Sequence, residues 1–442
     1  MKTSPDTPAL QCSIVWDQLK RFVAEKRAYA ESICAAEGKE MFPEIRTVYD
    51  AADKGDLETI AKTLDHLRWL APGADHRDWS KYCLRSQWCI AAEVWGVFRE
   101  FWPPGEKYTI QFGRDVIASI PPGSIYFGGN DPGRFAITTL CKSHTSGDPF
   151  FVLTQNALID KTYLRYLAGM YGSQIYIPTE EEFTTTYENY VREALQRQKE
   201  NKLIPGEFLK EVNGKVEVNG VVGVMMLNAV LSKLMFDKNP DRDFYIEEAF
   251  PLEWMYPHLT PHGLILKINR QPPAELDAAL VQRDRDYWKH RLRPILGDWL
   301  DQNTSIAEVA SFAERVHLRK DLTGFDGDPE FIHNDAPQRM FSKLRSSLGG
   351  IYAWRAQHAE STAVKSQMAA EADLAFRQAF ALCPRSAEAV FRYVNSRIPQ
   401  QRFDDAILIA ETHAKFADEN TPIHDIAGQL RQMKLKAAQP IA

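Results

Sequence analysis

The chain has 442 residues, of which 44% are hydrophobic and 25% are charged. This length is enough for two or three domains with their own cores. The formal net charge of −6 argues against a nucleic-acid-binding protein that works by bulk positive charge, so we expect no nucleic-acid partner. A local basic patch stays open as an alternative.

No stretch of the sequence approaches the roughly 18–20 uninterrupted apolar residues that a membrane helix needs. The N-terminus lacks the basic start and apolar core of a signal peptide. The sequence therefore predicts a cytoplasmic protein that does not span a membrane, and it leaves an extracytoplasmic location open. Its six cysteines are scattered, match no common metal motif and are expected to be free thiols in a reducing compartment.

Residues 1–104 are predicted to form an N-terminal helical region. Segments such as "LETIAKTLDHLRWL" place apolar residues at intervals of three and four, which is the period of an amphipathic helix. The "PPG" at positions 103–105 ends this pattern.

Residues 105–272 are predicted to form an α/β domain. Short apolar runs at 124–129, 149–155, 174–178, 243–250 and 263–269 are rich in β-branched and aromatic residues, and most are separated by helical patterns. This alternation predicts a largely parallel sheet covered by helices. Two local signals are sharper: Thr179 with Glu182 forms a capping box that begins a long helix, and Asn213-Gly214 predicts the turn of a β-hairpin.

The stretch "IYFGGNDPGRF" at 125–135 stands where a strand ends and a helix begins. Ligands of open α/β sheets bind at the carboxyl ends of strands, and helix N-termini attract anions. The candidate ligand-binding residues are Gly128, Gly129, Asn130, Asp131 and Gly133, with Gln155 and Asn156 at the end of the next strand. The alternative is a strand–turn–helix corner in which the asparagine and aspartate serve as caps.

Other patterns argue against familiar chemistry. No Lys-Ser/Thr pair follows the glycines, so the loop is no P-loop, and no catalytic nucleophile motif occurs. His258 and His262 follow Pro257 and Pro261, which argue against a helix that would present both histidines to one metal ion, and the sequence offers no obvious third ligand. Glu247 and Glu248 are adjacent in a predicted strand, so they should point to opposite faces. We therefore expect no metal and no cofactor.

Residues 273–349 are predicted to be a helical connector, and residues 350–442 a set of helical hairpins. Ala372, Phe376, Ala379 and Pro384 have the spacing of the second helix of a tetratricopeptide repeat. Ala406 lies one 34-residue period after Ala372. The tail therefore resembles tetratricopeptide repeats, with two departures: Gln401 replaces the usual glycine, and Pro399 cuts into a helix.

The central region carries a second resemblance. "IPPGSIYFGGND", "FVLTQNALIDKTYLRYL" and "FYIEEAFPLEWMYPHLTPHGLILKINR" resemble the soluble α/β part of bacterial membrane proteins related to protein O-mannosyltransferases. In that family the glycosyl-transfer chemistry is placed in a membrane domain, which has no counterpart in this sequence. The resemblance therefore implies an accessory soluble part, and no catalytic residue is carried over.

Two functions remain open from the sequence. The first is a non-catalytic binding or scaffold protein, linked to glycan or cell-envelope assembly, whose C-terminal helices bind a protein partner. The second is a sugar- or nucleotide-sugar-dependent transferase or hydrolase with its site at the carboxyl ends of the central strands. In that case Asn130, Asp131 and Gln155 would contact a small sugar-like ligand.

Overall fold

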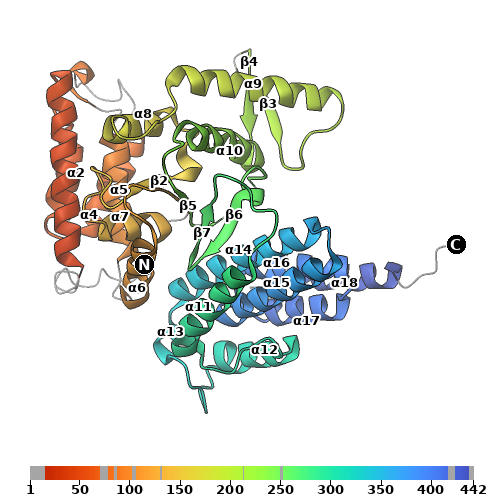
Figure 1. Cartoon of the computed structure of the whole chain (residues 1–442). Coiled ribbons are helices and arrows are strands. Elements are labelled where there is room, and N and C mark those ends of the chain that lie inside the picture. The colour runs from red at the N-terminus through yellow and green to blue at the C-terminus, as the bar shows by residue number, and fades with distance from the viewer. Residues whose placement is uncertain are drawn as a thin grey trace. The chain divides into compact units, whose positions relative to one another are not determined.

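The structure is a computed structural model that describes residues 15–69, 78–83, 87–101, 106–129, 132–212, 214–248, 252–416 and 424–437. The chain divides into two compact units, Met1–Met255 and Tyr256–Ala442. Its elements are a mixture of helices and strands, which confirms the predicted mixed α/β class (Figure 1). The four-part division made from the sequence stays a prediction.

The first unit contains a parallel set of strands with β1 (Ile125–Gly128) in the middle. One edge of β1 pairs with β2 (Phe151–Thr154) and the other pairs with β5 (Phe244–Ile246), both in parallel. Every residue of these strands is buried, as expected for parallel strands covered on both faces. The apolar runs of the sequence thus predict these three strands and their burial.

Helices make up most of the first unit. In chain order they are α2 (Trp16–Glu37), α3 (Pro43–Ala52), α4 (Leu57–Trp69), α5 (Gln87–Glu100), α6 (Glu106–Ser119), α7 (Ile137–Leu140), α8 (Lys161–Tyr171), α9 (Glu180–Lys199) and α10 (Val221–Lys238). Short helical turns lie at Trp79–Lys81, at Gln155–Ala157 and, as a π turn, at Pro132–Ala136.

Both sharp local predictions are confirmed. The Thr179 side chain accepts a hydrogen bond from the N–H of Glu182, and Glu182 accepts one from the N–H of Thr179, so the capping box begins α9. Strands β3 (Phe208–Val212) and β4 (Lys215–Asn219) pair antiparallel across a two-residue turn. Gly214 has a φ of +74° there, as a type I′ turn requires, while Asn213 lies outside the described residues.

The prediction of a strand at 174–178 is wrong. The segment begins as a turn and bend that continue from α8, and it joins no sheet. The side chain of Asn239 takes the place of a neighbouring strand: its Oδ1 accepts from the N–H of Tyr176 at 2.8 Å, and its Nδ2 donates to the carbonyl of Tyr176 at 3.1 Å. A polar side chain that follows α10 therefore satisfies the backbone groups that a ladder would have used.

The second unit begins with an antiparallel strand pair, β6 (Leu259–His262) and β7 (Ile265–Ile268). The sequence predicts β7 but not β6. Helices follow, namely α11 (Ala278–Leu296), α12 (Ile306–Phe312), α13 (Pro329–His333), α14 (Asp335–His358), α15 (Thr362–Leu382), α16 (Ala387–Arg397), α17 (Phe403–Ala414) and α18 (His424–Ala437). Short helical turns lie at Tyr256–His258, Ala313–Leu318 and Ile398–Gln400.

The residues that carry the repeat-like spacing lie in the core of these helices. Ala372, Phe376 and Ala379 of α15 are buried. Phe376 packs where Gly349 of α14 has no side chain, since a Cβ at Gly349 would lie 2.9 Å from its ring. Gln401 has a φ of +57°, so it adopts the left-handed conformation that glycine usually supplies. Membership of the tetratricopeptide family stays a prediction.

Candidate functional site

The carboxyl ends of the three parallel strands converge on the glycine loop after β1. The N–H of Gly129 donates to Oε2 of Glu247, which follows β5, at 2.7 Å. The Nδ2 of Asn156, which follows β2, donates to the carbonyl of Gly129 at 3.2 Å. Segments more than a hundred residues apart in the sequence therefore meet at one point, at the sheet edge where open α/β proteins bind ligands.

The glycines of this loop make room for a side chain of the protein itself. A Cβ added to Gly133 would lie 2.0 Å from the carboxylate of Glu247. A Cβ added to Gly128 would lie 3.0 Å from the carbonyl oxygen of Gly133, because the loop folds back on the end of β1. The Glu247 carboxylate thus lies against the loop, where the sequence pattern led us to expect the anion of a ligand.

The remaining predicted site residues are Asn130, Asp131 and Gln155. Asn130 and Asp131 lie outside the described residues. Gln155 is buried, and its Oε1 has no hydrogen-bond partner among the described residues. The structure thus brings Gly128, Gly129, Gly133 and Asn156 together, and Gln155 follows β2 directly before Asn156.

The two adjacent glutamates are both buried, with 3% of Glu247 and none of Glu248 exposed. Because β5 ends at Ile246, the alternation of strand side chains no longer separates them. Burial raises the pKa of Tyr126 well above its usual range, and the charges of both glutamates raise it further. Both carboxylates therefore lie within electrostatic reach of one tyrosine hydroxyl.

A third carboxyl group, on Glu100, belongs to the same neighbourhood. It is the last residue of α5 and is half-buried. Burial raises the pKa of Glu100 to about 7; the charge of Arg99 opposes this rise and the negative charge of Glu247 adds to it. Near neutral pH a large share of Glu100 is thus a neutral acid, close to the buried carboxylate of Glu247.

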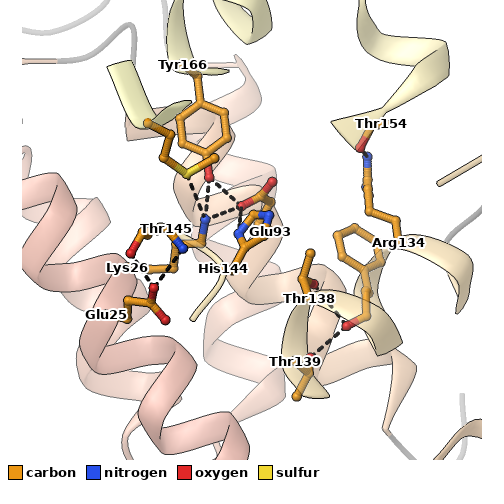
Figure 2. A network of polar contacts seen from close by, with 12 residues as sticks. Glu25, Lys26, Glu93, Arg134, Thr138, Thr139, His144, Thr145, Thr154 and Tyr166 are labelled. Atoms are coloured by element: carbon orange, nitrogen blue, oxygen red, sulfur yellow. Dashed lines mark hydrogen bonds and ion pairs between the residues drawn. The ribbon is translucent and has the colours of Figure 1, made fainter. Parts of the chain in front are cut away.

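Next to this region lies a buried polar network that the sequence reasoning missed (Figure 2). The Nζ of Lys26, in α2, is 2.7 Å from Oε2 of Glu93 in α5. The hydroxyl of Tyr166, in α8, donates to the same carboxylate oxygen at 2.6 Å, and Lys26 also donates to Tyr166. The Lys26 side chain is fully buried. One sequence signal was available, because Lys26 occupies a position of the apolar stripe of its own helix.

The charged groups of this network shift one another's pKa values. Burial would raise the pKa of Glu93, but the charges of Lys26 and His144 and its hydrogen bonds hold it at about 2. His144 has its Nδ1 3.8 Å from Oε2 of Glu93, and burial together with the Lys26 charge lowers its pKa to about 4. The network therefore holds a salt bridge beside a neutral histidine at neutral pH.

A second contact ties α2 to the segment that carries His144. The carboxylate of Glu25 accepts from the hydroxyl of Ser143 at 2.5 Å and from the N–H of Thr145 at 2.7 Å. Together with Lys26, this joins α2 to α5, α8 and the segment before β2 (Figure 2). No more than 6% of Lys26, Glu93 or His144 is exposed, so the network has no access for a substrate and acts as an anchor of the fold.

Arg134 and Phe135 lie in the turn between the glycine loop and α7. The Nη1 of Arg134 donates to the Thr154 hydroxyl at 3.1 Å, at the end of β2. Thr138 and Thr139 donate their hydroxyls to the carbonyl of Phe135 at 3.1 and 2.7 Å (Figure 2). These bonds stabilise the short π turn that follows the glycine loop.

No group of three or more histidine, cysteine or acidic side chains suited to a metal ion occurs within the described part of the chain. His258 instead donates from Nδ1 to the carbonyl of Asn269 at 2.7 Å. The five cysteines with a described position are free thiols, while Cys12 lies outside the described residues. Among the described helices, none is long and apolar enough to cross a membrane.

Comparison with known proteins gives no match to a protein-family model, to a curated protein or to a solved structure.

Proposed function

We propose that this chain is a non-catalytic binding or scaffold protein, and that its glycine loop serves the fold rather than a phosphate-bearing ligand. The observation that supports the proposal is the contact between Glu247 and the loop. The Gly129 N–H donates a hydrogen bond to the buried carboxylate of Glu247 at 2.7 Å, and the same carboxylate fills the space next to Gly133. An anionic ligand would have to displace a charged side chain that already has its hydrogen bond.

The experiment compares wild type with Glu247→Ala, which leaves a carboxylate-sized space at the loop. We expect acetate to raise the Tm of the variant but not of the wild type, because acetate replaces the missing carboxylate. UDP-glucose and GDP-mannose should leave the wild-type Tm unchanged. A rise in the wild-type Tm with either nucleotide-sugar would overturn the proposal.

The proposed partner is a protein that binds the C-terminal helices. Phe391 on α16 supports this surface, because 55% of this aromatic side chain is exposed and α16 presents it to solvent. We expect Phe391→Glu to abolish the capture of a partner by the immobilised full chain. The matched control is Leu318→Glu, at a position that is 41% exposed in the same unit, and it should retain the capture. Equal loss in both variants, or in neither, would contradict the proposal. The link to glycan or cell-envelope assembly is supported by the sequence resemblance.

The second candidate is a carboxylate-dependent hydrolase or transferase that acts on a sugar. The observation that favours it is Glu100, whose pKa of about 7 beside Glu247 suits a general acid. Such an enzyme would release nitrophenol from a panel of aryl glycosides, with activity falling above about pH 7 and lost in Glu100→Gln. Activity on no glycoside of the panel, or an unchanged rate in the variant, would remove this candidate.

A further inference from the structure

The second unit buries several charged side chains and pairs most of them. Four arginine side chains among its described residues are less than 9% exposed, namely Arg345, Arg355, Arg377 and Arg397. Three of the four have a carboxylate partner: Arg345 has Asp284 at 2.9 Å, while Arg377 and Arg397 share Asp373 at 3.1 and 2.6 Å. Such pairing is the rule for buried charges, because an uncompensated ion is costly in a protein interior.

Arg355 departs from this rule. Its guanidinium donates only to backbone carbonyls, from Nη1 to Pro273 at 2.8 Å and from Nη2 to Pro257 at 2.7 Å and Leu259 at 3.4 Å. Its Nε has no hydrogen-bond partner in the described part of the chain, and no carboxylate there forms an ion pair with it. The three carbonyls accept hydrogen bonds from both Nη nitrogens, but carbonyl dipoles do not neutralise the full positive charge.

Arg355 also lines a cavity of about 380 Å³ that lies wholly within the second unit. The walls are largely apolar and include Pro272, Pro273, Trp354, Val364 and Met368. This is the size and character of a small-molecule site, in which apolar walls surround a few polar groups.

The aromatic wall of the cavity is held in place. The ring of His358, which also lines the cavity, stacks on Trp354 with centroids 4.2 Å apart and planes 22° apart. The Nδ1 of His358 donates to the Trp354 carbonyl at 2.8 Å, which fixes the ring one turn further along α14. A flat, ordered apolar surface thus lies beside the buried guanidinium.

We propose that this cavity binds a small organic monocarboxylate, with its acid group beside the uncompensated positive charge of Arg355 and its apolar body against Trp354 and the prolines. A single uncompensated positive charge suits a monocarboxylate better than a phosphate dianion. Glu275 and Glu360 also line the cavity, and both are exposed, so water screens their charges and they form its rim. Neither Phe391 nor any residue of the glycine loop is among the residues that line the cavity.

The test uses the full chain and two acids, phenylacetate and hexanoate, with their uncharged amides as controls. We expect both acids to raise the Tm and to give a binding isotherm in calorimetry, and the amides to bind at least about tenfold more weakly. Glu275→Gln removes one negative charge from the rim. It should raise the affinity for both acids a few-fold, whereas it would lower the affinity for a cationic ligand.

Two variants and one control substitution separate binding from folding. Ala274→Trp fills the cavity from an exposed position, so it should abolish acid binding while leaving the circular dichroism spectrum unchanged. Arg355→Lys keeps a charge but loses the planar fork, and it should weaken the acids at least about tenfold. Arg339→Met removes an exposed arginine of the same helix and should leave the affinity unchanged. No binding of either acid, equal binding of the amides, or full binding by Ala274→Trp would overturn the proposal.

Discussion

A buried histidine of the second unit should make the stability of this protein depend on pH. His317 is 2% exposed, and its Nε2 donates to the carbonyl of Ala381 at 2.9 Å. Burial lowers the pKa of His317 from its ordinary 6.5 to about 4. The native state therefore keeps this imidazole neutral at pH values where the unfolded chain protonates it.

The sign and the size follow from proton linkage. A lowered pKa means that the unfolded chain binds the proton first as the pH falls below 6.5, so the native state loses relative stability until the pH reaches about 4. The difference of 2.5 pKa units corresponds to a total of about 3.4 kcal/mol, because each unit is worth about 1.36 kcal/mol. By pH 5 the loss relative to pH 7 should be about 2 kcal/mol.

The perturbation is His317→Gln, which keeps a side-chain N–H donor for the Ala381 carbonyl and removes the titration. Urea unfolding followed by circular dichroism gives the free energy of unfolding at pH 7 and pH 5 for both proteins. The wild type should lose about 2 kcal/mol more than the variant between these pH values. Groups that titrate in both proteins, including His144, cancel in this comparison. A loss that is the same within about 0.5 kcal/mol would refute a lowered His317 pKa.

Three other substitutions test separate parts of the fold. Gly133→Ala places a Cβ 2.0 Å from the Glu247 carboxylate and should lower the Tm by several degrees, whereas Gly350→Ala, whose Cβ would meet no atom within 4 Å, should not. Lys26→Met leaves the Glu93 carboxylate buried without its cation and should cost about 3–5 kcal/mol in urea unfolding, part of which Glu93→Gln should restore in the double variant. Gln401→Gly relieves the positive φ and should stabilise the protein by about 0.5–1 kcal/mol in the same assay, and an unchanged midpoint would show that the turn is not strained.

The sequence predicts best those elements that depend on neighbouring residues. The capping box of Thr179 and the hairpin at Gly214 each need only a few adjacent residues and a fixed local geometry, and both form. The three parallel strands are also predicted, because strands covered on both faces need unbroken apolar runs. The place of the glycine loop at the end of β1 follows from the same reasoning.

The features that the sequence analysis predicted wrongly or did not predict share one cause: each depends on a partner that is distant in the sequence. The segment at 174–178 has the composition of a strand, but Asn239 satisfies Tyr176 from another element. Glu247 could not be linked to Gly129 from the sequence, because 118 positions separate them. The salt bridge of Lys26 likewise joins two helices, and the pattern of a single helix shows only that a lysine lies on its apolar side.

Among the buried arginines of the second unit that the structure describes, Arg345, Arg377 and Arg397 have a carboxylate partner and Arg355 has none. Lys26 and Glu93 neutralise each other, and Arg345 has Asp284, so each pair is complete without a ligand. Residue types at a strand end are a weaker guide to a ligand site. The same glycines and carboxylate that suggest a site can also form a loop whose space is filled by the protein's own side chain, as Glu247 does here. A buried charge that lines a cavity without an opposite charge is a stronger guide, since the protein must gain the missing charge from outside or bear its cost. By this criterion Arg355 marks the cavity where a ligand should first be sought.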